Sequence, residues 1–436
     1  MMRRLLTVIL LLIALMAFLT HIKFAGEDHL MSASMMALGF TLIAAYLIGK
    51  TVMRLQLPKI TGYILAGILA GPYVTDLLSV PVVRNLQLID NIALSLIALT
   101  AGGEFRYKTI KKQMKTIGST ILWQVIIVLL TFVIFIFLYQ NHISFLAHKP
   151  LNVVLGVALI FGSLAIAKSP ATTIAIITES RAKGKFTDFV LGVTVFKDIV
   201  VVLVFSIVIS FAKPMILPET PLHFTYLFNV FLEIILSIIV GFAAGLLILF
   251  YLKYVGKQTV LFLLGFILLG IELSRMFHLE VILLFMVAGF FVQNFSNAGG
   301  KLISAIEGGS LPIFVIFFAI AGASLNFPVF LENWFLAVLI VGLRMLSTYE
   351  GTYIGARLTG GSREVQNYGW MGFIGQAGLT LGLAVLVKQN LPGIIGESIA
   401  TLIIASIAIN QIVGPVMFRY SLVKVGETGV NRRRSA

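Results

Sequence analysis

The sequence predicts an all-α polytopic membrane protein. Of its 436 residues, 59% are hydrophobic and only 11% are charged, whereas an ordinary soluble domain carries roughly 25% charged residues. The apolar residues fall in blocks of about 16–28, and a helix needs about 20 of them to cross a bilayer. No soluble domain could bury so many blocks of this length, so we expect the lipid bilayer to surround most of the chain.

Fourteen apolar segments are predicted as membrane spans. In chain order they cover residues 5–20, 33–50, 58–76, 86–105, 115–139, 151–178, 187–211, 224–251, 259–272, 279–296, 304–323, 334–356, 366–388 and 396–418. They divide the chain into an N-terminal span with an outer loop, a membrane domain and a basic cytoplasmic tail, which cover 1–32, 33–418 and 419–436.

The first span begins like a signal peptide, because Arg3 and Arg4 precede an apolar run. No small-residue cleavage site follows this run, so we expect a retained signal-anchor helix. Cleavage is the alternative, and it would leave thirteen spans.

The basic residues indicate the orientation of the chain. Of its 32 Lys and Arg residues, 23 lie in gaps on the side of the N-terminus, 6 lie in gaps on the other side and three lie inside segments. By the positive-inside rule both termini are cytoplasmic. The net charge of +14 therefore reflects topology, and we expect no nucleic-acid partner because no soluble domain offers a basic face. The chain has no cysteine, which excludes disulfides and thiolate metal sites.

Two similar motifs suggest an internal repeat. Residues 101–105 (AGGEF) end the fourth span on the cytoplasmic side, and residues 321–327 (AGASLNF) end the eleventh on the opposite side. The spans around them form five-helix units over about 58–211 and 279–418 that enter the membrane from opposite faces. Inverted-topology repeats of this kind are common in secondary transporters.

Four charged residues lie deep inside apolar segments, namely Lys168, Lys197, Asp198 and Arg344. A charge at the bilayer centre costs about 2.5–3.5 kcal/mol or more, so it marks a polar interior or pathway. At 1.5 Å per helical residue, Asp198 lies roughly 16 Å deep and Arg344 roughly 15 Å deep. In a hydrocarbon core about 30 Å thick, both fall near the midplane.

Two spans carry helix-breaking residues at the same depth. The sixth is interrupted by residues 168–173 (KSPATT), and the thirteenth by Gly372, Gly375, Gln376 and Gly378. Proline removes a backbone donor and clashes with the preceding turn, and glycine weakens helices. Unwound backbone at membrane depth is tolerated only where it is buried in protein or lines a cavity, so these two interruptions predict a transport site.

Three sequence runs resemble the monovalent cation:proton antiporter superfamily, in the branch of bacterial sodium/proton exchangers and potassium-efflux proteins. Residues 58–72 (PKITGYILAGILAGP) are similar to its early signature, and residues 169–173 and 191–198 to its first crossed helix and carboxylate helix. The resemblance covers nearly all of the chain from about residue 33. It implies an inverted-repeat antiporter fold with two crossed discontinuous helices, a homodimer with a moving core domain, an inner-membrane location and no cofactor.

The resemblance also implies residue roles. Asp198 falls at the essential aspartate that binds ion and proton, and Arg344 falls in the helix that carries a conserved base. Lys197 departs from the family, whose members usually have Asp, Asn or Gln there. We expect no appended nucleotide-binding domain, since only 18 residues follow the last span.

These observations predict a secondary transporter that exchanges Na⁺ or K⁺ for H⁺ by alternating access. One group must bind either a proton or a cation, and a midplane carboxylate does this because protonation removes the charge that attracts the cation. We expect Asp198 to bind both, with oxygen ligands from Ser169, Thr172, Thr173 and freed carbonyl groups. If Asp198 alone exchanges one ion for one proton, transport is electroneutral.

Lys168, Lys197 and Arg344 are the expected electrostatic partners of this site, and Gln376 is the polar side chain of the second broken span. A different interpretation makes Asp198 a static partner of Lys197 or Arg344. Two other functions stay open: a channel-like cation conductor, although no filter motif is present, and a non-transporting membrane sensor with the same fold. An enzyme is not expected, since neither HExxH nor a phosphate-binding glycine loop occurs.

Overall fold

The computed structural model describes residues 29–55, 57–86, 88–218, 224–325, 327–376, 378–391 and 393–429. Helices make up most of this part of the chain, and no strand occurs in it. The predicted first span, residues 5–20, and the last seven residues of the basic tail lie outside the described residues.

The helices follow the predicted apolar segments closely. They are α2 (His29–Val52), α3 (Lys59–Ala70), α4 (Val80–Leu86), α5 (Leu88–Glu104), α6 (Tyr107–Ile110), α7 (Met114–Tyr139), α8 (Leu151–Ile166), α9 (Pro170–Ser180), α10 (Lys185–Ile216), α11 (Phe224–Tyr254), α12 (Thr259–Met276), α13 (Val281–Phe295), α14 (Gly299–Gly309), α15 (Leu311–Ala323), α16 (Phe327–Leu358), α17 (Arg363–Tyr368), α18 (Gly378–Asn390) and α19 (Ile394–Val425). Four 3₁₀ segments join some of them: η1 (Met53–Leu55), η2 (Lys111–Gln113), η3 (Gln140–His142) and η4 (Gly369–Phe373).

Fewer of these helices can cross a membrane unaided than the fourteen segments predicted. By length and composition, the described residues hold eight such helices, or up to ten if each of two bent pairs is one span. One predicted segment, 5–20, lies outside the described residues. Three others have a physical cause: α3 and α13 have only 12 and 15 residues, and the thirteenth predicted segment is interrupted. The predicted span 304–323 is in fact α14 and α15, which meet at an angle of 61°, with Pro312 in the first turn of α15.

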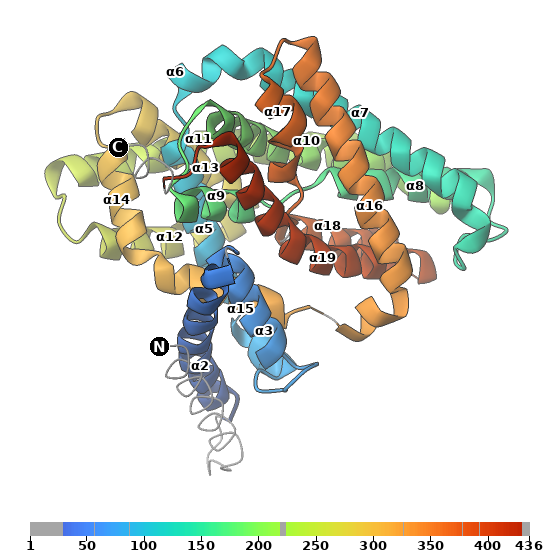
Figure 1. The fold of residues 1–436 in the computed structure, drawn as a ribbon, viewed down its shortest axis with the longest axis horizontal. Coiled ribbons are helices and arrows are strands. Elements are labelled where there is room, and N and C mark those ends of the chain that lie inside the picture. The colour runs from blue at the N-terminus through green and yellow to red at the C-terminus, as the bar shows by residue number, and fades with distance from the viewer. Residues whose placement is uncertain are drawn as a thin grey trace.

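The two halves of the membrane domain pack against each other in a reciprocal order. Helix α3 packs on α15, α5 on α13 and α7 on α16, and Figure 1 shows α7 beside α16 at one side of the molecule. Glycines allow the closest approaches, because a side chain on Gly67 or Gly102 would collide with a backbone carbonyl of α15 or α13. A two-fold relation between the units 58–211 and 279–418 would produce this pairing, and their boundaries stay a prediction.

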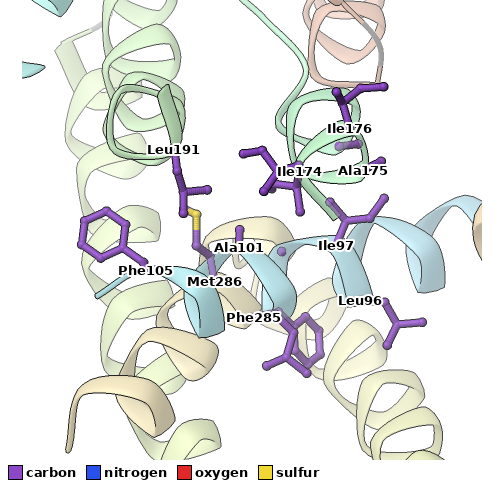
Figure 2. Close-up of a cluster of buried hydrophobic side chains, with 14 of the residues drawn as sticks. Leu96, Ile97, Ala101, Phe105, Ile174, Ala175, Ile176, Leu191, Phe285 and Met286 are labelled. Carbon is purple, nitrogen blue, oxygen red and sulfur yellow. The ribbon is translucent and has the colours of Figure 1, made fainter. Parts of the chain in front are cut away.

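A large apolar cluster joins α5, α9, α10 and α13 (Figure 2). Ile97 of α5 lies near Ile174 and Ala175 of α9, and Ala101 of α5 lies near Met286 of α13, with Leu191 of α10 above Met286 in this view. All six side chains are buried. In the described residues no hydrogen bond joins α9 or α10 to α5 or α13, so the contact between these two pairs of helices is apolar.

The start of α10 is capped from the other end of the chain. Its N-cap is Gly184, which has no side chain to satisfy the first N–H groups. The Glu427 carboxylate accepts from the N–H groups of Phe186 at 2.9 Å and Thr187 at 2.8 Å, and from the Thr187 hydroxyl at 2.6 Å. Because a carboxylate also interacts favourably with the positive end of a helix dipole, this contact ties the segment after α19 to the start of α10.

Glu427→Gln is expected to lower the free energy of unfolding by about 1 kcal/mol, the usual worth of a helix cap. The amide keeps the size of the side chain but loses its charge and one acceptor. Thermal unfolding of the purified protein in detergent measures the change. Glu272→Gln is the control, since Glu272 is exposed and contacts only Arg275, at 3.6 Å. Equal stability changes in the two variants would show that the cap contributes nothing.

Candidate functional site

The first break in the membrane domain lies between α8 and α9. Helix α8 ends at Ile166, Ala167 and Ser169 are extended, and α9 begins at Pro170. Proline suits the first position of a helix because its N–H would be unsatisfied there anyway. The Ser169 hydroxyl caps α9 by accepting from the N–H of Thr172 at 3.2 Å. The sequence Ser-Pro-x-Thr therefore ends one helix and begins the next.

The second break lies between η4 and α18, and it touches the first. The N–H of Ser169 donates to the Gly375 carbonyl at 2.7 Å, and the Thr173 hydroxyl donates to the Gly372 carbonyl at 3.0 Å. A Cβ on Gly375 would lie 3.0 Å from the Thr172 side chain, so glycine permits the close crossing. Both predicted interruptions are confirmed, and the structure brings them together.

Arg344 joins the carbonyl ends of the two broken spans. Its guanidinium donates four hydrogen bonds of 2.7–2.9 Å, to the carbonyls of Ala165, Ala167, Phe373 and Ile374. The residue is only 1% exposed. Carbonyl ends of helices carry partial negative charge and favour cations. The positive charge of Arg344 therefore offsets the partial negative charge at the carbonyl ends of both broken spans. Among the described residues it forms no ion pair with Asp198, which removes Arg344 as the static partner of that aspartate.

Gln376 and Asn410 extend this polar contact to α19. The Gln376 amide donates to the carbonyls of Leu164 at 3.3 Å and Ala167 at 3.1 Å, and the Asn410 amide donates to the Gln376 side-chain oxygen at 2.8 Å. Gln376 thus contacts the end of α8 rather than Asp198. These bonds hold three helices together at the crossing.

Asp198 faces Lys168, the residue at the first break. Their charged atoms, Lys168 Nζ and Asp198 Oδ1, lie 3.8 Å apart. Asp198 is 8% exposed and Lys168 is fully buried. Within the described residues neither of these two atoms has a hydrogen-bond partner. Buried polar atoms are nearly always hydrogen-bonded, and an exception calls for an explanation such as an ion, water or a catalytic role.

Lys197 points away from Asp198, as expected for neighbours about 100° apart on a helix. Its ammonium donates to the Gln124 side-chain oxygen at 2.6 Å and lies 5.6 Å from the centre of the Phe373 ring. The Gln124 amide in turn donates to the Thr352 hydroxyl at 2.7 Å. Lys197 therefore links α10 to α7 and α16. Sequence reasoning missed Gln124, although a glutamine inside an apolar span is a recognisable signal.

The hydroxyls of Ser169, Thr172 and Thr173 are engaged within the break itself. The Thr172 hydroxyl donates to the Ser169 hydroxyl at 3.1 Å, and Thr173 lies within 3.3 Å of the Ser169 carbonyl. All three residues are buried. No direct hydrogen bond joins any of them to Asp198 in the part of the chain that the structure describes.

Asp198 lines a cavity of about 60 Å³. Two other carboxylic residues line it as well, Glu233 of α11 and Glu280 just before α13. Sequence reasoning missed both, although Glu233 lies inside a predicted span, where an acid is expensive. No group of three or more His, Cys, Asp or Glu residues in the described ranges is placed to hold a metal ion.

A buried carboxylate beside two crossed, broken helices defines a secondary-transporter type of membrane protein. Residues 38–424 match the family described as sodium/hydrogen exchanger, transmembrane. The chain belongs to this family, which is a family of multi-pass membrane transporters and not of enzymes.

Individual relatives agree with this assignment. A Na(+)/H(+) antiporter of Enterococcus hirae is 22% identical over 271 residues, which cover 62% of this chain and 70% of the relative. Two structures of a sodium proton antiporter from Methanocaldococcus jannaschii have the same fold. The first has a TM-score of 0.70 and 19% sequence identity, and the match covers 92% of this chain and 98% of that structure. The second, determined at pH 8, has a TM-score of 0.64 and 18% sequence identity, and the match covers 90% of this chain and 96% of that structure. The antiporter fold predicted from the sequence is confirmed.

Proposed function

We propose that this protein exchanges Na⁺ for H⁺ across the cell membrane by alternating access, and that Asp198 binds the cation and the proton in turn. The Asp198 carboxylate carries the proposal: it is buried near the middle of α10, lines a cavity and has one oxygen without a hydrogen-bond partner. The printed names of the relatives favour sodium, and K⁺ stays the alternative cation.

The competition between the two ions follows from charge. A deprotonated Asp198 attracts a cation, and a protonated one does not. Lys168 lies 3.8 Å from the carboxylate, so its ammonium compensates the negative charge while no cation is bound. An arriving Na⁺ then displaces Lys168 from Asp198, and Ser169, Thr172, Thr173 and backbone carbonyls of the breaks are the oxygen ligands that the sequence predicts.

The expected moving unit is the group of helices around the crossing, α7–α10 and α16–α19. Its contact with α5 and α13 is the apolar cluster of Figure 2. An apolar contact can slide at low cost, which supports alternating access and disfavours a channel with a continuous polar filter. The hydrogen bonds from the unit to the start of α3, at Leu57 and Lys59, would have to break or move with it. A homodimer and cytoplasmic termini remain part of this proposal, as the resemblance and the distribution of basic residues predict.

The test is a transport assay with the full chain in proteoliposomes. Internal pH is followed with a trapped dye while NaCl, KCl or choline chloride is added outside. Because NaCl is added outside, Na⁺ entry is expected to drive H⁺ out and to raise the internal pH, whereas choline chloride is expected to leave the internal pH unchanged. The rate is expected to be insensitive to a K⁺/valinomycin potential if one Na⁺ exchanges for one H⁺. Pore-like flux without proton coupling would favour the channel, and no flux would favour the sensor.

A further inference from the structure

Three carboxylic residues from three helices share the cavity beside Asp198. Glu233 lies on α11, Glu280 is the N-cap residue of α13, and Asp198 lies on α10. They are far apart in the sequence, and only the packing of α11 against α10 and α13 brings them to one space. The rest of the lining is mainly apolar, including Ile234 and Met286.

The backbone around the two glutamates is fixed, while their carboxylates are free. The N–H of Glu280 donates to the Ser237 hydroxyl at 2.8 Å, and that hydroxyl donates to the Glu233 carbonyl at 2.6 Å. Neither glutamate carboxylate makes a hydrogen bond or an ion pair within the described residues. Three carboxylates in a mainly apolar cavity repel one another unless cations or protons compensate them.

The charges form a series from the site to the surface. Glu280 lines the cavity together with Asp198 and Glu233. It lies two residues after His278, which is exposed in the connection between α12 and α13. The cavity has room for a few water molecules, each of which occupies roughly 30 Å³ in the liquid. The Asp198 oxygen without a hydrogen-bond partner lies at the inner end of this series.

We propose that Glu233 and Glu280 hold a partly hydrated monovalent cation in a waiting site between Asp198 and the surface that carries His278. This inference rests on the proposed function, because it takes the waiting ion to be the cation that the protein transports. It is a weak, water-mediated site, since the three carboxylates are not arranged as direct ligands of one metal ion. Its role is to raise the local concentration of cations beside Asp198.

Equilibrium binding of ²²Na⁺ to the purified full chain in detergent tests the waiting site without requiring transport. Asp198→Asn removes the inner carboxylate, and we expect a weakened but measurable Na⁺ binding to remain. Adding Glu233→Gln and Glu280→Gln to that variant is expected to abolish the remainder. Adding Glu397→Gln instead is the control, because Glu397 is exposed and pairs with Lys388 at 3.4 Å. Equal binding in the triple variant and the control variant overturns the proposal.

Transport kinetics give an independent readout. In proteoliposomes, the double variant Glu233→Gln/Glu280→Gln is expected to raise the KM for Na⁺ roughly tenfold when Na⁺ is supplied from the side of the membrane that carries His278. The maximal rate is expected to stay nearly unchanged, because the variant loses a contribution to Na⁺ binding that is the same before and during transport. Since the chain has no cysteine, Glu280→Cys can be labelled selectively. Labelling the Glu280→Cys variant with a negatively charged sulfonate reagent is expected to return its KM for Na⁺ toward the wild-type value. Labelling it with a positively charged ammonium reagent is expected to raise that KM further.

The outcomes separate this proposal from the proposed function. An unchanged KM in the double variant, or a KM indifferent to the sign of the reagent, overturns the waiting site while antiport stands. A wild-type chain that binds Na⁺ through the glutamates but moves no protons supports the waiting site and overturns antiport.

Discussion

Asp198→Asn is expected to reduce Na⁺-driven proton movement in proteoliposomes by at least roughly 100-fold, a loss of about 2.7 kcal/mol of stabilisation. Asparagine has nearly the same shape, but it neither binds a proton near neutral pH nor carries the charge that holds a cation. Asp198→Glu, which keeps the carboxylate, is expected to retain measurable exchange. Asp76→Asn, the same chemical change at an exposed position, is the control and is expected to transport like the wild type.

A purely structural Asp198 would behave differently. If Asp198 only neutralised Lys168, the 3.8 Å pair could be replaced by two neutral residues without loss of function, since buried ion pairs often exchange for uncharged pairs at little cost. The double variant Lys168→Gln/Asp198→Asn is therefore expected to fold and to remain inactive. Exchange at the wild-type rate in this variant would remove Asp198 from the mechanism.

Arg344→Lys is expected to lower the free energy of unfolding by about 3–5 kcal/mol, because at least two of the four buried carbonyls lose the donor that Arg344 provides. Lysine keeps the charge but lacks the planar fork of donors, so it cannot serve the four carbonyls of the two breaks. A buried carbonyl without a donor costs about 1–3 kcal/mol. The measurement is the midpoint of thermal unfolding of the detergent-purified protein, together with the fraction that elutes as a single species.

Arg357→Lys is the matched control on the same helix. Arg357 lies at the exposed end of α16, and within the described ranges its guanidinium bonds to the Tyr353 side chain alone, so its replacement is expected to change stability by less than about 0.5 kcal/mol. If Arg344→Lys were as stable as Arg357→Lys, the guanidinium would not be what holds the broken spans together. Arg344→Ala is expected not to accumulate as folded protein, because the carbonyls of Ala165, Phe373 and Ile374 lose their Arg344 donor and that of Ala167 keeps only the Gln376 amide.

Local features of the sequence were sufficient to predict the membrane fold and the two breaks in it. Apolar blocks correspond to helices because a bilayer requires about 20 apolar residues per span. Pro170 begins α9, and the glycines at 372, 375 and 378 lie in or beside the second break. Proline cannot continue a helix from the preceding turn and glycine weakens one, so both breaks were predictable. The cost of a charge in lipid likewise singled out Asp198 and Arg344.

Only the tertiary structure decided which of these groups meet. Asp198 contacts Lys168 rather than Lys197 or Arg344, and Arg344 binds carbonyls of residues 179 and 177 positions earlier in the chain. The glutamates at 233 and 280 and the cap from Glu427 were not predicted. Composition and local propensity act over one or two helical turns, whereas these contacts join elements that are distant in sequence and are set by how whole helices pack.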